Sequence, residues 1–285
     1  MNRKKTTAII LAAGTGKRMK SSTAKQYLLL SGKPIIYYSL KAFEESTVDE
    51  IILVVGNNEI EYCENSLVKK YNFKKVTRII EGGKERYHSV YHGLKEIKAA
   101  DKVLIHDGVR PFITVDIIEE AIRSLDTYGA CVVGVPSKDT IKLINSDGTV
   151  KETPDRNKVW SIQTPQAFTY EIIYKAYCMI MDKMAYNRDK MAYDGDKMTY
   201  DRDKMTDKTP SQDNTNGYSV NEPINEYSNE LSYDSASRIS ITDDAMVVEH
   251  TLNYPVRMIM GSYSNIKITT PEDILIGEAL LKGLL

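Results

Sequence analysis

Short apolar runs alternate with amphipathic stretches through the first half of the chain. The apolar runs are rich in Ile and Val and predict buried strands at Thr6–Leu11, Glu50–Val55, Val76–Ile80, Lys102–His106 and Ala130–Val135. The stretches between them predict helices at Pro34–Glu45, Glu59–Tyr71, Ser89–Ala99 and Val115–Tyr128, with Pro34 at a first helical position and Thr114 as an N-cap. This alternation predicts an α/β fold with a mostly parallel sheet covered by helices on both faces. Ligands of such sheets bind beyond the carboxyl ends of the strands.

The pattern changes after Pro136, where two short apolar stretches flank a turn. Thr140–Ile144 and Val150–Thr153 enclose Asn145-Ser146-Asp147-Gly148, and an Asp-Gly pair between such stretches is a strong hairpin signal. The segment 138–159 therefore predicts a projecting β-arm. It contains too few apolar residues to be stable alone, so we expect it to pack on another surface.

Residues 184–237 contain almost no aliphatic side chains and begin with a repeat of seven residues, DKMAYNR, that starts at Asp182. Met184 and Tyr186 are two positions apart and would lie on roughly opposite faces of a helix, so the repeat gives no coiled-coil seam. We interpret 184–237 as a low-complexity insert that is disordered or forms a weakly helical extension of the preceding segment. The ordered pattern resumes with a helix at Thr242–Glu249, a strand at Val256–Met260 and a helix at Pro271–Lys282, so 1–183 and 238–285 form one domain.

Composition narrows the class of protein without pointing to a reaction. The 285 residues carry a net charge of −1, which gives no argument for binding nucleic acid or a membrane surface. The three cysteines are far apart and have no metal-site spacing, which favours a reducing, cytoplasmic location.

A turn with two glycines follows the first predicted strand. Gly14 and Gly16 let the backbone approach a ligand, and successive amides there can bind an anion. A dinucleotide-binding fingerprint would need a third glycine at Met19, and a P-loop would need Ser or Thr at Arg18, so both are excluded. With Arg18 and Lys25 close by, the turn suits a triphosphate.

Six segments then define a more specific pattern. They are Leu11-Ala12-Ala13-Gly14-x-Gly16-x-Arg18-Met19 with Lys25-Gln26, Gly82-Gly83-x-Glu85-Arg86-x-x-Ser89-Val90, His106-Asp107-x-x-Arg110-Pro111, Asp139-Thr140, Asp155-Arg156 with Thr164-Pro165-Gln166, and Asn265-Ile266-Lys267-Ile268-Thr269. In this order they resemble the methylerythritol phosphate cytidylyltransferase family of sugar-nucleotidyltransferases, apart from the insert. The resemblance implies a Rossmann-like nucleotidyltransferase sheet and transfer of CMP from CTP to a sugar-alcohol phosphate.

The resemblance also implies roles for individual residues. Arg18 and Lys25 match the transition-state stabilisers, and Arg156 and Lys267 match the residues that position the acceptor phosphate. Further contacts to that acceptor are implied for Arg110, Thr140, Thr164 and Thr242. The nucleotide-binding positions are Ala12, Ala13, Gly14, Gly16, Gly82, Gly83, Ser89 and Asp107.

Two further expectations follow from the resemblance. Asp107 ends a strand at a place where carboxylates meet ribose or Mg²⁺ in these folds, and both readings stay open. The family also implies a homodimer in which each arm reaches the neighbouring subunit and delivers Arg156 there.

Three other functions compete with this reading. A ribitol-phosphate cytidylyltransferase would tend to have Ala-Gly-Gly where this chain has Ala12-Ala13-Gly14. A catalytically silent nucleotide-binding regulator would be favoured by loss of Lys25 or Lys267, and both are present. An interaction protein acting through the Met/Tyr repeat would require 184–237 to bind a partner.

Overall fold

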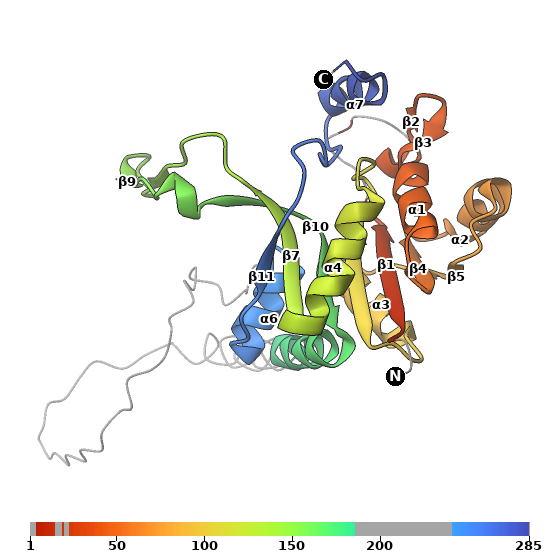
Figure 1. Ribbon diagram of the computed structural model, residues 1–285, viewed down its shortest axis with the longest axis horizontal. Helices are drawn as coiled ribbons and strands as arrows, with labels where there is room; N and C mark the ends of the chain where they lie inside the picture. Colours follow the sequence, from red (N-terminus) through yellow and green to blue (C-terminus); the bar gives the residue numbers. More distant parts are fainter. Residues whose placement is uncertain (1–3, 15–18, 20–22, 186–240, 285) are drawn as a thin grey trace, which may run out of the picture. The chain divides into compact units, whose positions relative to one another are not determined.

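The structure is a computed structural model and describes residues 4–14, 19, 23–185 and 241–284 (Figure 1). The chain divides into two units, Met1–Cys178 with Ile241–Leu285, and Met179–Ser240. Of the predicted insert 184–237, only residues 184 and 185 are among the described residues. In the part of the chain that is described, no helix is long and apolar enough to cross a membrane.

The first unit is built on a seven-stranded sheet with the order β11-β7-β10-β6-β1-β4-β5. Five strands confirm the apolar runs of the sequence: β1 Thr6–Ala12, β4 Glu50–Val55, β5 Val76–Glu81, β6 Lys102–Asp107 and β7 Ala130–Pro136. Every residue of β4 and β6 is buried, as expected for central strands covered on both faces. β1 pairs in parallel with β4 and β6, so the three strands end at the same edge of the sheet.

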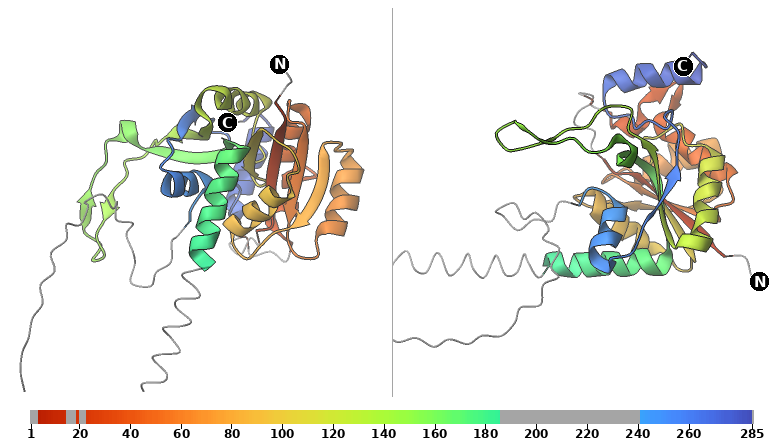
Figure 2. Two further views of the ribbon diagram at one scale, coloured as in Figure 1. Left: turned by 90° about the horizontal axis from the view of Figure 1, so that it is seen from below. Right: turned by 60° about the vertical axis from the view of Figure 1, so that its left-hand side comes forward.

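Helices cover both faces of this sheet (Figure 2). Ile10 of β1 belongs to the core cluster that also contains side chains of α1 (Ile35–Glu45) and α4 (Val115–Tyr128). The neighbouring Ile9 points the other way, because a Cβ added to Gly93 of α3 (Arg86–Glu96) would lie 2.8 Å from its Cγ2. The two-residue period of a strand thus gives β1 two buried faces, one for α1 and α4 and the other for α3.

The predicted helices are present, with corrections at their ends. α4 begins after Thr114, whose hydroxyl accepts a hydrogen bond from the Ile117 amide, as predicted. Pro34 precedes α1 rather than opening it, because it is in the β3 strand of a small β2–β3 hairpin. The Ser89–Ala99 bounds were wrong: the backbone N–H of Glu85 donates to His88 Nδ1, and α3 begins at Arg86 and ends at Glu96.

The other elements complete this unit. They are β2 Leu29–Leu30, β3 Lys33–Pro34, α2 Ile60–Cys63, a π-helical turn at Glu64–Lys69, β8 Leu143–Ile144, β9 Val150–Glu152, α6 Asp244–Leu252, β11 Arg257–Met260 and α7 Pro271–Leu281. β8 and β9 form the predicted hairpin, with Gly148 at a φ of +84° in the turn. They are shorter than expected, and all their residues are exposed.

One strand of the seven-stranded sheet has no counterpart in the sequence prediction. β10 (Trp160–Thr169) runs antiparallel between β6 and β7, and a helix follows it from residue 170. Its register shifts between Ile162 and Gln166, around a cis peptide bond at Thr164-Pro165. A proline and several buried polar side chains hide this strand from any search for apolar runs. The sheet is thus mostly parallel, as predicted, with one antiparallel strand near its middle.

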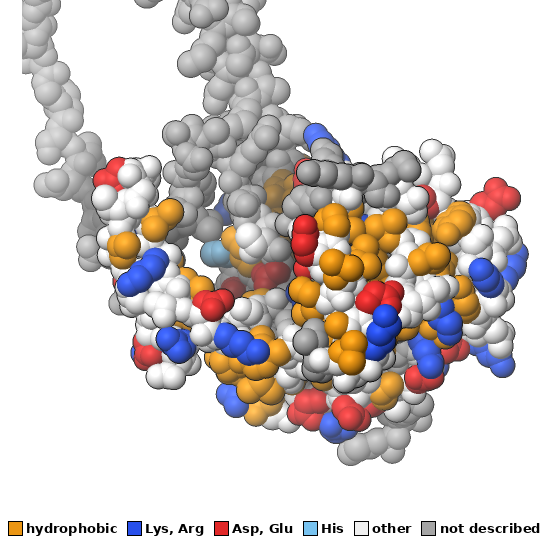
Figure 3. Space-filling model, turned by 90° about the horizontal axis from the view of Figure 1, so that it is seen from above, with side chains coloured by type: hydrophobic (Ala, Val, Ile, Leu, Met, Phe, Trp, Pro, Cys, Tyr) orange, Lys and Arg blue, Asp and Glu red, His pale blue; other side chains and the backbone are white. Residues whose placement is uncertain are grey.

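Hydrophobic side chains are prominent on the side of the molecule seen in Figure 3, where α7 lies in Figure 1. Leu275 of α7 is 72% exposed, whereas Leu53 in the middle of β4 is fully buried. The two leucines therefore allow a matched comparison of buried and exposed apolar surface.

We expect Leu53→Ala to lower the free energy of unfolding by about 2–5 kcal/mol, because it removes packed methyl groups and leaves a cavity. Leu275→Ala should change that free energy by no more than about 0.5 kcal/mol. Urea unfolding followed by circular dichroism measures both. Equal effects of the two substitutions would contradict the assignment of β4 to the core.

Candidate active site

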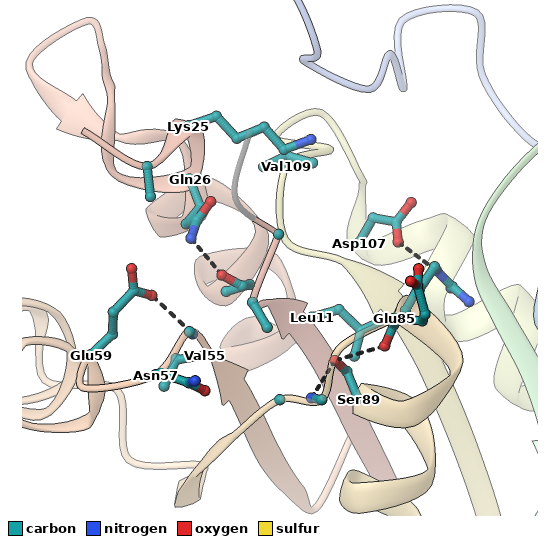
Figure 4. A pocket seen from close by; sticks show the side chains of 18 of the residues that line it. Leu11, Lys25, Gln26, Val55, Asn57, Glu59, Glu85, Ser89, Asp107 and Val109 are labelled. Atoms are coloured by element: carbon teal, nitrogen blue, oxygen red, sulfur yellow. Dashed lines mark hydrogen bonds and ion pairs between the residues drawn. The ribbon is translucent and has the colours of Figure 1, made fainter. Parts of the chain in front are cut away.

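A cavity of about 840 Å³ opens at the edge of the sheet where the parallel strands end (Figure 4). Its walls come from the residues that follow β1, β4 and β5 and from the last residue of β6. This is the position expected for a ligand of a parallel sheet. The lining residues include Leu11, Ala12, Ala13, Gly14, Lys25, Gln26, Val55, Asn57, Glu59, Gly82, Gly83, Glu85, Arg86, Ser89, Asp107, Val109 and Lys267.

The turn after β5 and the turn after β1 touch each other in the cavity wall. A Cβ added to Gly82 would lie 2.4 Å from the Cβ of Ala13 and 2.7 Å from the Oγ of Ser89, so only glycine fits this position. The Gly83 amide donates to Ser89 Oγ over 3.0 Å. The Gly82-Gly83 turn, Ala13 and Ser89, predicted to bind the nucleotide, therefore form one surface.

Lys25 lies beside the first turn. A Cβ added to Gly14 would lie 4.0 Å from the Cε of Lys25, and Figure 4 shows the Lys25 side chain at the cavity near Val109. The neighbouring Gln26 is 1% exposed and donates through Nε2 to the carbonyl oxygen of Ala12. This bond ties the short helix Lys25–Tyr27 to the end of β1 and places Lys25 over the cavity.

Asp107 is the buried carboxylate at the end of β6, surrounded by cations. Its Oδ2 lies 2.8 Å from Lys267 Nζ and 3.9 Å from Arg110 Nε, and its Oδ1 lies 3.3 Å from Arg86 Nε. Burial alone would raise the pKa of Asp107, but the charges of Arg86, Lys267 and Arg110 outweigh it and hold that pKa far below its usual value. Asp107 is therefore ionised at any working pH.

Lys267 is held by the backbone on both sides of it. The Ile268 amide donates to the Val109 carbonyl, and Arg110 Nη1 donates to the Asn265 carbonyl over 2.8 Å. Asn265 is fully buried, and its Nδ2 donates to the Thr164 carbonyl. The loop before α7 is thereby fixed against β10 and against the loop after β6, and it presents Lys267 to the cavity.

Behind Asp107 lies a buried polar chain. The Asp107 amide donates to Thr164 Oγ1, which is 3.0 Å from His106 Nδ1, while His106 Nε2 has no hydrogen-bond partner among the described residues. Burial lowers the pKa of His106 to about 3, so the imidazole is neutral. His106 is fully buried and cannot reach a ligand in the cavity. Thr164, a predicted substrate contact, supports Asp107 from behind.

Several predicted site residues do not line the cavity. Arg156 donates through Nη2 to Thr140 Oγ1 over 3.1 Å, and both residues are exposed on the arm. Thr242 is exposed, and its hydroxyl lies 3.4 Å from Met246 Sδ. Gly16 and Arg18 lie outside the described residues.

The sequence analysis did not predict that Arg86 and Asp244 form a pair in this region. Arg86 Nη1 and Nη2 donate to the two carboxylate oxygens of Asp244 over 2.9 and 2.8 Å, although the residues are 158 positions apart. The signal was weak: Asp243 and Asp244 follow Thr242 where a helix was expected, and a helix needs one cap. Asp243 Oδ1 accepts from the Met246 amide as that cap, which leaves Asp244 for Arg86.

No cluster of three or more His, Cys, Asp or Glu side chains that could hold a metal occurs within the described ranges. The described residues thus contain no preformed metal site around Asp107. Whether Asp107 meets a metal ion or the ribose depends on the ligand that binds in the cavity.

Comparisons with known proteins agree with this geometry. A family model described as 2-C-methyl-D-erythritol 4-phosphate cytidylyltransferase matches residues 6–193 and 222–283. The chain is 46% identical over 278 residues to a protein of that name from Lachnoclostridium phytofermentans, covering 98% of this chain and 97% of the relative. It is 41% identical over 283 residues to one from Alkaliphilus oremlandii, covering 99% and 97%.

Among solved structures, this fold resembles 4-diphosphocytidyl-2C-methyl-D-erythritol synthase from Anaerococcus prevotii, with a TM-score of 0.70 and 29% identity. The match covers 98% of this chain and 96% of that one. The likeness supports an α/β nucleotidyltransferase fold.

The buried neutral His106 predicts a pH dependence of stability. Its folded pKa of about 3 lies below its ordinary value. Its contribution is therefore complete above an unfolded pKa of ~6.5 and is lost as the pH falls toward the folded pKa. Between about pH 6 and pH 4 the free energy of unfolding should fall by about 1.4 kcal/mol more per pH unit in wild type than in His106→Asn. Urea unfolding at a series of pH values compares the slopes, and equal slopes would show that His106 is not buried neutral.

Proposed function

The chain belongs to the 2-C-methyl-D-erythritol 4-phosphate cytidylyltransferase family, and we propose that the cavity at the ends of β1, β4, β5 and β6 is its active site. The chain is an enzyme that transfers CMP from CTP to 2-C-methyl-D-erythritol 4-phosphate and releases pyrophosphate, in the non-mevalonate route to isoprenoids. The comparisons give no support to the ribitol-phosphate, regulator or interaction-protein alternatives. The observation that carries the site is the convergence of Lys25, the Gly82-Gly83 turn and the Asp107 cluster on one cavity.

On the nucleotide side, CTP occupies the wall made by Ala12, Ala13, Gly14, Gly82, Gly83 and Ser89, and we assign Gly16 to nucleotide binding from the sequence. Backbone amides and carbonyls at this wall can distinguish the edge of a base, because the two turns touch and neither can shift alone. The amides of the first turn suit the phosphates. Lys25 lies beside this turn, where negative charge grows on the α-phosphate during transfer, and we assign the same role to Arg18.

On the acceptor side, the cluster around Asp107 has an excess of positive charge. Arg86, Arg110 and Lys267 contribute three positive charges against the carboxylates of Asp107 and Asp244, which leaves a net +1 in the described cluster. Lys267 is about a third exposed and lines the cavity, so its ammonium can bind a phosphate while Asp107 holds it in place. Arg110 and Thr164 support the same wall.

The reaction needs no general base from the protein. A phosphate monoester has a second pKa of ~6, so the acceptor is largely dianionic at neutral pH. One of its oxygens attacks the α-phosphorus of CTP, the new P–O bond forms, and the bond to the β-phosphate breaks as pyrophosphate leaves. The catalytic task is to hold two anions in line, which Lys25, Arg18, Lys267 and Arg156 serve by charge.

Magnesium is the proposed cofactor, and the residues present fit it. Mg²⁺ binds few protein carboxylates and prefers phosphate oxygens, and Asp107 is an ionised carboxylate on the cavity wall. When bound, the ion would neutralise charge on the triphosphate. Asp107 would be the protein ligand of this ion or would meet the ribose. Arg86 and Lys267 each contact one of its carboxylate oxygens and hold the carboxylate in place for either role.

A homodimer is the proposed assembly. The arm exposes apolar side chains, with Ile144 65% and Val150 58% exposed, and its Arg156 does not line the cavity of its own subunit. Docking of the arm on a second copy would bury these side chains and bring Arg156 and Thr140 to the partner's acceptor site. Thr242 is proposed as a further contact there.

We also propose that the chain forms a single interrupted domain and that the protein is cytoplasmic. The family model matches the chain on both sides of 194–221, within the predicted insert 184–237, which supports the proposal that the insert interrupts one nucleotidyltransferase domain. Cys63, Cys131 and Cys178 are free thiols, which suits the cytoplasm.

We expect the purified protein, with CTP and Mg²⁺, to use methylerythritol phosphate far better than ribitol phosphate. Pyrophosphate release measures both reactions side by side. Lys25→Ala should lower kcat about 10²- to 10³-fold with either acceptor, which is the usual scale for one preorganised charge contact. This variant therefore also controls for activity from a contaminating enzyme. A higher kcat/KM for ribitol phosphate would overturn the acceptor assignment.

The dimer proposal predicts complementation between two inactive variants. Lys25→Ala and Arg156→Ala dimers are mixed and their subunits exchanged after mild dissociation. If Arg156 acts on the neighbouring subunit, one site of each mixed dimer carries both lesions and the other carries none. Random pairing makes half the dimers mixed, so about a quarter of wild-type activity should return.

If Arg156 serves its own subunit, every site keeps one lesion and no activity returns. Mass spectrometry of the intact dimers confirms that exchange took place, so absence of recovery would exclude delivery to the neighbour.

A further inference from the structure

Asp244 is a fully buried carboxylate that meets Arg86 and a tyrosine. Its two oxygens accept from Arg86 Nη1 and Nη2, and Oδ1 also accepts from the Tyr177 hydroxyl over 2.6 Å. Burial raises the pKa of Tyr177, and the charge of Asp244 raises it further, so the hydroxyl keeps its proton and donates. A bidentate pair of this kind fixes the plane of the guanidinium as well as its position.

The position of Asp244 is fixed to the sheet by a single glutamine. Gln166 of β10 is 1% exposed, and its Oε1 accepts from the amides of Asp244 and Ala245. Its Nε2 donates to Asp243 Oδ2 over 3.0 Å. Gln166 pairs with Ile105 of β6, two residues before Asp107, so the start of α6 is tied to the strand that carries the cavity carboxylate.

Arg86 is shared between this anchor and the cavity. Two of its nitrogens are occupied by Asp244, which leaves Nε to face Asp107 Oδ1 at 3.3 Å. Asp107 Oδ2 therefore remains for Lys267 at 2.8 Å. Without the Asp244 charge, the guanidinium would be free to turn its fork onto Asp107 and compete with Lys267 for the same carboxylate.

We propose that Asp244, held by Tyr177 and Gln166, is a positioning residue for the reaction, which orients Arg86 so that Asp107 holds Lys267 in the acceptor site. This inference rests on the proposed function, because Lys267 is its endpoint. It predicts a graded defect: the acceptor site should suffer most, because the wall formed by Ala13, Gly82 and Ser89 contains none of these contacts and Asp107 alone is shared with the nucleotide.

The test is steady-state kinetics of the full chain with both substrates varied. Asp244→Asn keeps the shape of the side chain and removes its charge. We expect it to lower kcat/KM for methylerythritol phosphate about ten- to a hundredfold, the scale of a small misplacement in an active site. KM for CTP should change several-fold less than this, because Asp107 is the only shared contact on the nucleotide side. Tyr177→Phe should shift the same parameter by about two- to fivefold, since it loses one hydrogen bond.

Thr251→Val is the matched control. It removes a side-chain hydrogen bond to the Val247 carbonyl in the same helix α6, but leaves the Arg86–Asp244 pair and the Gln166 contacts in place, so acceptor kinetics should not change. A folded Asp244→Asn with wild-type acceptor kinetics, or with CTP affected as much as the acceptor, would overturn the proposal. If Asp244→Asn fails to fold, unchanged acceptor kinetics in Tyr177→Phe would overturn it.

Wild-type turnover, measured first, separates this inference from the function on which it rests. An inactive wild type would refute the proposed function, whereas an active wild type with an equally active Asp244→Asn refutes the positioning role alone.

Discussion

The Asp107 carboxylate carries a full negative charge at a largely buried position, where water can solvate it only in part. Such a charge is stable only if cations compensate it, and the chain supplies them from three places: Arg86 at the start of α3, Arg110 in the loop after β6, and Lys267 before α7. Each cation must itself be held, Arg86 by Asp244 and Arg110 by the carbonyl of Asn265. Much of the polar structure around the cavity follows from this one buried charge.

The excess of cations also makes this region suitable for phosphate chemistry. With carboxylates already paired, the remaining positive charge is available to an incoming anion, and its geometry is set before the ligand arrives. The same low polarity that makes Asp107 costly to bury strengthens each contact that a phosphate would make there. Arg110 and Lys267 thus hold Asp107 in the structure and are also the groups that we propose to act on the acceptor phosphate.

The sheet explains why these groups meet. Parallel strands bring the ends of β1, β4, β5 and β6 to one edge, and each is followed by a turn or a polar side chain at the cavity. The antiparallel β10 then inserts beside β6 and contributes Thr164 behind Asp107 and Gln166 beneath Asp244. The buried polar residues of β10 link β6 to α6 and to the loop that carries Lys267.

Local sequence determined much of this architecture, because a buried strand is specified by its own apolar run and a helix start by its own cap. The five strands predicted in the first half of the chain, the cap at Thr114 and the turn at Gly82-Gly83 are examples, and the order of short motifs indicated the family. Only the tertiary structure decided the central place of β10 and the pairing of Arg86 with Asp244. Both depend on which distant segments meet, and a polar residue acquires its partner only when the fold removes water from around it.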